Sequence, residues 1–157
     1  MRLSKKEELH VKKIKDGTVI DHISTGYALD VLKILKITGK EKHIVSILMN
    51  VPSKEVGRKD VVKIENWELR PKDVDRIALI APHATINIIR DYKVVDKKKV
   101  NLPRVIKGIV KCNNPTCISN SREPIESMFH IKDFESLCIS CHYCGRTMEK
   151  DDVLGQF

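Results

Sequence analysis

The stretch "LHVKKIKDGTVIDHISTGYALDVLKILKITG" (9–39) changes its hydrophobic period about halfway along. Its first half mixes apolar and polar residues around Gly17, which is typical of two strand segments joined by a turn. Residues 24–39 switch to the period of an amphipathic helix. The apolar positions of that helix follow the spacing i, i+3, i+4 and i+7, at Ala28, Val31, Leu32 and Leu35. Ser24 or Thr25 can cap its start, and Gly39 can end it.

Working outward from this stretch, strand patterns recur around one further helix. The strand-like runs are "HIVSILMNV" (43–51), "DVVKIENWEL" (60–69), "ATINII" (84–89) and "YKVVDKKKV" (92–100). The intervening "PSKEVGRK" (52–59) is predicted to be a loop. A helix can begin at Pro71, a favoured first-turn residue, and end before Pro82. The order β-α-β-β-α-β predicts a ferredoxin-like domain with both helices on one face of the sheet.

All five cysteines follow this region, in "CNNPTC" (112–117) and "CISCHYC" (138–144). Two close pairs of thiolates are the pattern of a tetrahedral zinc site in an all-β zinc ribbon. Gly145, just after the last cysteine, permits the left-handed backbone conformation that suits a metal-binding turn. We assign the metal ligands as Cys112, Cys117, Cys141 and Cys144. Cys138 is then a half-buried strand residue.

Two alternatives to this ligand set remain. The five cysteines could be unrelated free thiols in a reduced core, or His130 and His142 could replace cysteines as ligands. Four thiolates close the coordination shell and leave no position for a catalytic water. A module of this size also has too little core to fold unaided, so one structural zinc ion per chain is expected.

Charge divides the chain at the same point as the cysteines. Residues 1–111 contain 25 Lys/Arg and 14 Asp/Glu, a net charge of +11, whereas residues 112–157 contain 4 and 7, a net charge of −3. We therefore predict a basic domain over 1–100, a linker over 101–111 and a zinc-binding domain over 112–157. No apolar run approaches the roughly 18–20 residues of a membrane span, and "MRLSKKEELH" lacks a signal-peptide core, so a cytoplasmic protein is expected.

The basic domain offers side chains that could bind an anion. Neither a Walker-A loop nor a G-x-G-x-x-G loop is present. Lysines at or near strands can converge on phosphate oxygens from an open sheet face: Lys59, Lys63, Lys97 and Lys99. Asp21 can accept from ribose hydroxyls, and His22 can donate to a phosphate. From the residues alone, an anion or nucleotide binder is the furthest supported interpretation.

Four motifs, in this order, resemble the regulatory chain of aspartate carbamoyltransferase: "GTVIDHI", "GRKDVVKIEN", "APHATINIIRDYKVV" and the C-x4-C…C-x2-C ribbon. The likeness runs from about Leu9 to Val153. It implies a ferredoxin-like allosteric domain that binds CTP or ATP and a zinc domain that holds the catalytic chain. It also implies regulatory dimers that bridge catalytic trimers. The chain would then be a non-catalytic subunit in pyrimidine biosynthesis.

The resemblance also implies which residues form the nucleotide site. By matching position they are Ile14, Ile89 and Tyr92 at the base, Asp21 and Lys63 at the ribose, His22 and Lys97 at the phosphates, and Lys59, Asn87 and Val94 completing the site. The four zinc ligands match those assigned from spacing, and Cys138 lies outside the family pattern.

Two other classes of protein compete with this interpretation. A zinc-ribbon protein that binds nucleic acid would fit the pI of about 9.3, but its acidic ribbon would be repelled by phosphates. A nucleotide-processing enzyme would need a metal-carboxylate cluster, an activated nucleophile or a phosphate loop. The expected partners are therefore nucleotides, a catalytic chain and a second copy, with neither nucleic acid nor a membrane.

Overall fold

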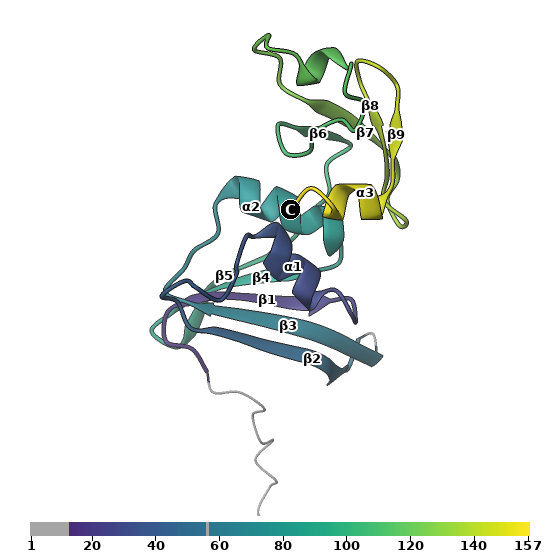
Figure 1. The fold of residues 1–157 in the computed structure, drawn as a ribbon. Coiled ribbons are helices and arrows are strands. Elements are labelled where there is room, and N and C mark those ends of the chain that lie inside the picture. The colour runs from purple at the N-terminus through teal and green to yellow at the C-terminus, as the bar shows by residue number, and fades with distance from the viewer. Residues whose placement is uncertain (1–12, 56) are drawn as a thin grey trace, which may run out of the picture.

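The computed structural model describes residues 13–55 and 57–157 (Figure 1). The first part contains β1 (Gly17–Ile23), α1 (Ala28–Ile34), β2 (Val45–Ser53), β3 (Gly57–Glu65), α2 (Pro71–Ile80), β4 (Thr85–Arg90) and β5 (Lys93–Lys99). The second part contains β6 (Val105–Lys107), a short 3-10 helix η1 (Ile118–Asn120), β7 (Met128–Asp133), β8 (Cys138–Cys141), β9 (Thr147–Met148) and α3 (Lys150–Leu154). Across these described residues, no helix is long and apolar enough to cross a bilayer.

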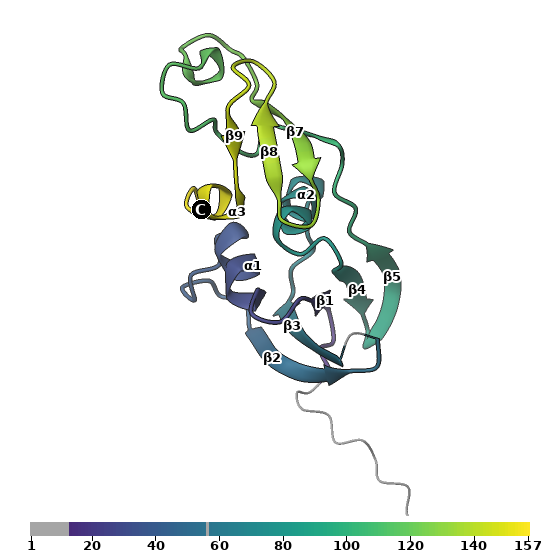
Figure 2. The ribbon, with the colours of Figure 1, turned by 90° about the vertical axis from the view of Figure 1, so that its right-hand side faces the viewer.

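The first sheet has five strands in the order β2-β3-β1-β4-β5, all antiparallel to their neighbours. Its first four strands and two helices have the order and pairing of a ferredoxin-like fold, and β5 adds a strand at one edge. Both helices lie on the same face of the sheet (Figures 1 and 2). The predicted α+β class is confirmed.

The hydrophobic core of this part lies between the sheet and the helices. Ile20 on β1 is paired with Val62 on β3 and with Ile86 on β4, so these three side chains share the helix-facing side. They belong to one buried cluster with Val31 of α1 and Ile77 of α2. Alternate residues of the strands thus pack against the apolar faces of the two helices.

Helix α1 is shorter at both ends than the sequence predicts. Residues 24–27 form a turn closed by a bond from the Tyr27 N–H to the Ser24 carbonyl, so the helix begins only at Ala28, and neither Ser24 nor Thr25 caps it. At the other end Lys36 adopts a φ of 59°, and the Ile37 N–H donates to the Leu32 carbonyl. This is a Schellman-type ending, and it stops the helix before Gly39.

The strand boundaries also differ from the predicted ones. β2 continues to Ser53 and β3 begins at Gly57, so the predicted loop over 52–59 is mostly strand. Before β1, residues 13–16 are not strand, and residues 9–12 of the expected first strand segment lie outside the described residues. After a bulge in the register, β2 and β3 pair again from Val51 and Lys59 onward, so the pairing continues into the predicted loop.

The second sheet has the order β6-β7-β8-β9. Its buried residues include Phe129, Ile139 and Met148, one from each of three adjacent strands. β6 falls within 101–111, the segment predicted to be a linker, and pairs with β7 along its whole length. The exact domain limits stay a prediction, but the chain is already part of the second sheet at Val105.

The two parts are packed against each other. Figures 1 and 2 show α1 and α2 lying between the first sheet and the second sheet, with α3 beside α1. Val100 and Leu102 lie in the same buried cluster as Ile106 and Val110. The hydrophobic core therefore continues from one part into the other.

Candidate metal centre and nucleotide site

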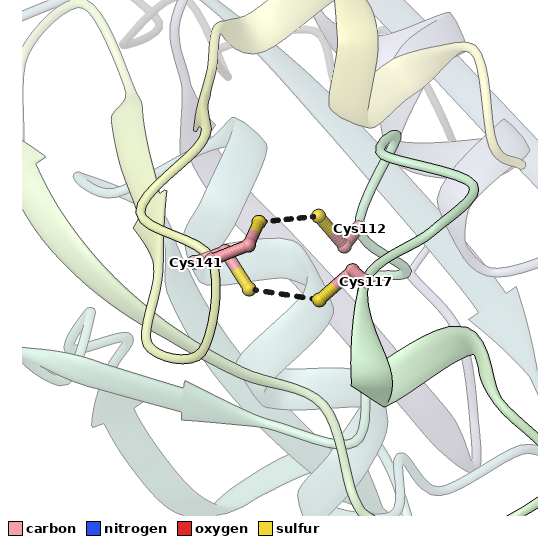
Figure 3. A group of neighbouring side chains, drawn as sticks. Cys112, Cys117 and Cys141 are labelled. Carbon is pink, nitrogen blue, oxygen red and sulfur yellow. Dashed lines mark hydrogen bonds between the residues drawn. The ribbon is translucent and has the colours of Figure 1, made fainter.

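The four cysteines assigned as ligands come together in the second part. The Sγ atoms of Cys112, Cys117, Cys141 and Cys144 all lie within 4.8 Å of one another. Figure 3 shows the sulfur atoms of Cys112, Cys117 and Cys141 pointing toward a common space. The pairs Cys112–Cys144 and Cys117–Cys141 are each separated by 3.6 Å. Four sulfur atoms bound at about 2.3 Å to one tetrahedral zinc ion lie roughly 3.8 Å apart, so the donor set fits zinc.

Two turns position these sulfur atoms. In the first turn, the Asn120 side-chain amide donates to the carbonyls of Cys112 and Asn114, at 2.8 Å in both cases. In the second turn, Gly145 has a φ of 76° and its N–H donates to the Cys141 carbonyl at 2.9 Å. The left-handed backbone expected after the last cysteine is therefore present.

The surroundings of the thiols shift their pKa values in opposite directions. Burial raises the pKa of the Cys112 thiol to about 12. The backbone N–H of Arg146 is the main cause that lowers the pKa of Cys144 to about 6. A hydrogen bond with the Ser119 hydroxyl, at 3.1 Å, lowers the pKa of Cys117. Because a metal binds thiolates, loading this site releases protons.

The other candidate ligands lie elsewhere. Nε2 of His130 and Nδ1 of His142 are 2.9 Å apart, so the two imidazoles pair with each other, and neither belongs to the cysteine cluster. Cys138 opens β8, is partly buried and is also outside the cluster, as predicted. The structure therefore gives no support to histidine ligands among the described residues.

Strand register places most of the residues assigned to the nucleotide site on the sheet face opposite α1 and α2. Strand register forms one row across four strands there, because Lys63, Val19, Asn87 and Lys97 are successive cross-strand partners. We call these four residues the polar row. Partners in an antiparallel sheet point to the same face, and the helices occupy the other face through Val62 and Ile20.

The predicted base residues lie beside the polar row. Ile89 is buried and pairs with Val94, one step along the strands. Tyr92 sits in the tight turn after β4, and its N–H donates to the Lys15 carbonyl at 2.9 Å. That bond joins the backbone of Tyr92 to the residue that follows Ile14, whose side chain is buried. The apolar members of the predicted set are thus gathered at one side of the face.

Asp21, His22 and Lys59 of the predicted set lie at the other side of the polar row. Lys59 Nζ is 2.8 Å from Asp21 Oδ1, and His22 Nε2 is 3.3 Å from Glu55 Oε2. His22 Nδ1 is enclosed and lacks a hydrogen-bond partner within the described part of the chain. His22 Nδ1 lies 3.9 Å from Asp21 Oδ1, which is too far for a hydrogen bond. Asn87 Oδ1 is likewise enclosed and without a partner among the described residues.

Both halves of the chain match family models. Residues 9–101 match the allosteric domain of the aspartate carbamoyltransferase regulatory chain, and residues 104–154 match the metal binding domain of the same chain. The chain belongs to the family of aspartate carbamoyltransferase regulatory chains. It is therefore a regulatory, non-catalytic subunit with an allosteric and a metal-binding domain.

Other aspartate carbamoyltransferase regulatory chains match along almost their full length. The one from Methanothermobacter thermautotrophicus is 51% identical over 158 residues, which cover 100% of both chains. The one from Korarchaeum cryptofilum is 51% identical over 152 residues, which cover 96% of this chain and 97% of the relative. The one from Pyrococcus abyssi is 53% identical over 149 residues, which cover 94% and 97%.

Sequence reasoning missed residues at one end of the allosteric domain. A cleft of about 440 Å³ lies beside His22 and is lined by Arg58, His83 and Lys99, among others. Of these three, only Lys99 was singled out from the sequence. Arg58 and His83 are far apart in the chain, and although each lies in a motif that carries the family resemblance, neither was assigned to a site, and only the fold brings them together. The buried Asp60 next to this end was also missed, although an aspartate on the apolar side of a strand pattern is a readable signal.

Proposed function

We propose that this chain is the allosteric subunit of an aspartate carbamoyltransferase that binds CTP and ATP, one structural zinc ion and the catalytic chain. The nucleotide would bind the open face of the first sheet, at the ten residues assigned above. The zinc-loaded second part would contact the catalytic chain. The observation that carries the proposal is the polar row, together with two enclosed polar atoms, one in the row (Asn87 Oδ1) and one beyond it (His22 Nδ1).

The chemistry of the open face supports a nucleotide. Lys63 and Lys97 stand at the two ends of the polar row, and Asn87 lies between them with a carbonyl oxygen that has no hydrogen-bond partner among the described residues. An enclosed polar atom without a partner costs free energy, which a ligand group can recover. Apolar residues at one side and cations at the other match a molecule with a base and a phosphate chain.

A zinc ion would hold the second part in shape. Three of the four cysteines are buried, and the cluster joins the turn after β6 to the turn between β8 and β9. Four thiolates would fill the coordination shell, so the ion would supply cross-linking and no bound water for chemistry. Its binding free energy would then be folding free energy for this small sheet.

Exposed apolar side chains near the cysteines support a protein partner. Ile118 is 50% exposed and follows Cys117 directly, and Tyr143 is 39% exposed between Cys141 and Cys144. Large apolar side chains on the turns of a rigid metal module are typical of an interface core. We assign this surface to the catalytic chain of the assembly.

The two edge strands of the first sheet differ in their side chains, and this difference supports a regulatory dimer formed at one of them. The edge strand β2 exposes Ile47 and Met49, and Ile44 just before it is also exposed. The opposite edge, β5, carries Lys93 and the run Lys97–Lys99, and lysine-rich edges resist pairing. We therefore expect a second copy of the chain to associate at β2.

Calorimetric titration of CTP and of ATP onto the purified, zinc-loaded chain tests the effector role. We expect one site per chain, competition between the nucleotides, and weaker binding as salt screens the lysines. If neither CTP nor ATP binds, the proposed effector role is wrong. If a complex with the catalytic chain still formed, the assignment of the metal-binding part would remain.

A further inference from the structure

Asp60 places a carboxylate inside the apolar side of the first sheet. It follows Lys59 on β3 and precedes Val61, and its side chain shares the helix-facing side with Val62. Its exposed fraction is 0%. A buried carboxylate is costly unless its oxygens accept hydrogen bonds, so its partners define its role.

Three backbone N–H groups donate to this carboxylate. Oδ2 accepts from Gly26 at 2.9 Å, in the turn between β1 and α1, and from Ala28 at 3.2 Å, the first residue of α1. Oδ1 accepts from Asn50 at 2.8 Å, on β2. One side chain thus connects the turn after β1, the first residue of α1 and the middle of β2.

The strands on both sides of Asp60 are bulged at its level. On β1 the register shifts between Ile20 and Ile23, and His22 within that shift has a φ of 55°. On β2 the register shifts between Leu48 and Val51, and Asn50 within it has a φ of 62°. Bulges redirect side chains and are frequent next to binding sites. Asp60 supplies a hydrogen-bond acceptor where the β2 bulge interrupts the ladder.

Further hydrogen bonds connect the same segments to cationic side chains at this end of the sheet. Arg58 Nη1 donates to the Asn50 carbonyl at 2.8 Å, and the Thr25 hydroxyl donates to the Arg58 carbonyl at 3.4 Å. Lys59, adjacent to Asp60, points to the opposite face and pairs with Asp21 at 2.8 Å. Displacing the Asp60 carboxylate would therefore move the backbone that carries Arg58, Lys59 and His22.

We propose that Asp60 is a positioning residue for the phosphate end of the nucleotide site. Its hydrogen bonds fix the β2 bulge and the turn between β1 and α1, and through them the direction of Lys59 and that of His22, which lies in the β1 bulge just before this turn. Asp60 itself is enclosed on the helix side and touches no nucleotide. This inference rests on the proposed function, since it assumes that a nucleotide triphosphate binds the open face.

Asp60→Asn tests the inference with little change in size. An asparagine has one carbonyl oxygen and one NH₂ group, so in either orientation the NH₂ faces an N–H donor. CTP and cytidine are titrated onto the full zinc-loaded chain, with Val62→Ala as a control that weakens the core on the same side of the same strand. We expect Asp60→Asn to weaken CTP binding about tenfold or more, because charge-assisted contacts to the phosphates are lost. Cytidine binding should be unchanged, and Val62→Ala should leave both affinities unchanged.

A variant that binds CTP and cytidine as well as the unmodified chain does would overturn the role of Asp60 and leave the proposed function intact. Failure of the unmodified chain to bind CTP would instead defeat the proposed function.

If Asp60→Asn does not fold, hydrogen exchange of the backbone amides in the unmodified chain, with and without CTP, still tests the inference. CTP should slow exchange at Gly26, Ala28 and Asn50, although none of the three belongs to the predicted contact set. Unchanged exchange at all three amides under saturating CTP would also overturn the inference.

Discussion

The ammonium of Lys150, in α3, lies 3.5 Å from the hydroxyl of Tyr27, at the start of α1, and 4.5 Å from the centre of its ring. The contact joins residues 123 positions apart and links the allosteric part to the metal-binding part. Tyr27 also lies between Gly26 and Ala28, whose N–H groups both donate to Asp60. A continuous set of contacts therefore runs from β3 to the carboxyl-terminal helix.

We expect Lys150→Met to reduce the effect of CTP on catalysis in the full assembly without changing CTP affinity for the isolated chain. A cation–π contact at a partly exposed site contributes about 0.5–1 kcal/mol, a sizeable share of a typical coupling free energy of about 1–3 kcal/mol. The measurement is the inhibition of the reconstituted enzyme by CTP, with Lys132→Met, at an exposed position of β7, as the matched control. An unaltered response in Lys150→Met would show that this contact carries no coupling.

Substitution of the cysteines should separate ligands from bystanders. Cys144→Ser should abolish stoichiometric zinc and unfold the second sheet, because metal binding supplies its folding free energy. Cys138→Ser should retain one zinc ion per chain, since Cys138 lies outside the sulfur cluster. Metal analysis and circular dichroism of both variants check this. Zinc retained by Cys144→Ser and lost by Cys138→Ser would reverse the ligand assignment.

Two neighbouring lysines provide a test of which sheet face binds the nucleotide. Lys97 belongs to the polar row, whereas Lys98 pairs with Ile86 and points to the helix side. Lys97→Ala should weaken CTP about tenfold or more, because a hydrogen bond to a charged group is worth roughly 1.5–3 kcal/mol. Lys98→Ala removes the same charge and should have a much smaller effect. Equal losses in the two variants would mean that the lysines act only through net charge.

The hydrogen bonds of the Glu41 carboxylate lead us to expect that the turn after α1 loses stability in acid. This carboxylate accepts from the N–H and hydroxyl of Thr38 and from the N–H of Gly39. The backbone N–H of Thr38 is the main cause that lowers its pKa from 4.5 to about 2. A folded-state pKa below the unfolded value stabilises the turn above pH 4.5, and that stability is lost as the pH falls toward 2.

An NMR titration of the Glu41 carboxyl and the Thr38 amide should show a common midpoint near pH 2. Glu41→Gln should remove the transition of the Thr38 amide from that range. A Glu41 midpoint close to 4.5 would contradict the hydrogen-bonded turn.

The hydrophobic periods predicted the elements of the first sheet because each element buries one regular face. They could not predict where α1 ends, since Lys36 takes a left-handed conformation that the sequence favours at Gly39. Nor could they predict that Val105 already pairs in the second sheet, because a three-residue strand is too short to show a period. The spacing of the cysteines did select four whose sulfur atoms come together.

The nucleotide residues were harder to predict from physics alone. Lysines on strands are usually solvated, and only the strand register shows that Lys63 and Lys97 lie in one row with Asn87. The resemblance to a known family assigned these residues to a nucleotide site. Arg58 and His83, which line the cleft beside His22, depend on tertiary structure and were missed.

The most direct test of the regulatory role is an assay of catalytic trimers from the same organism, with and without this chain. Initial rates are measured against aspartate concentration in the absence of nucleotide, with CTP and with ATP. We predict that the nucleotides shift the saturation curve only when the zinc-loaded chain is present, because they can act only by binding one state of the complex more tightly. Superimposable curves under all three conditions, in a complex shown to contain both chains, would contradict the account.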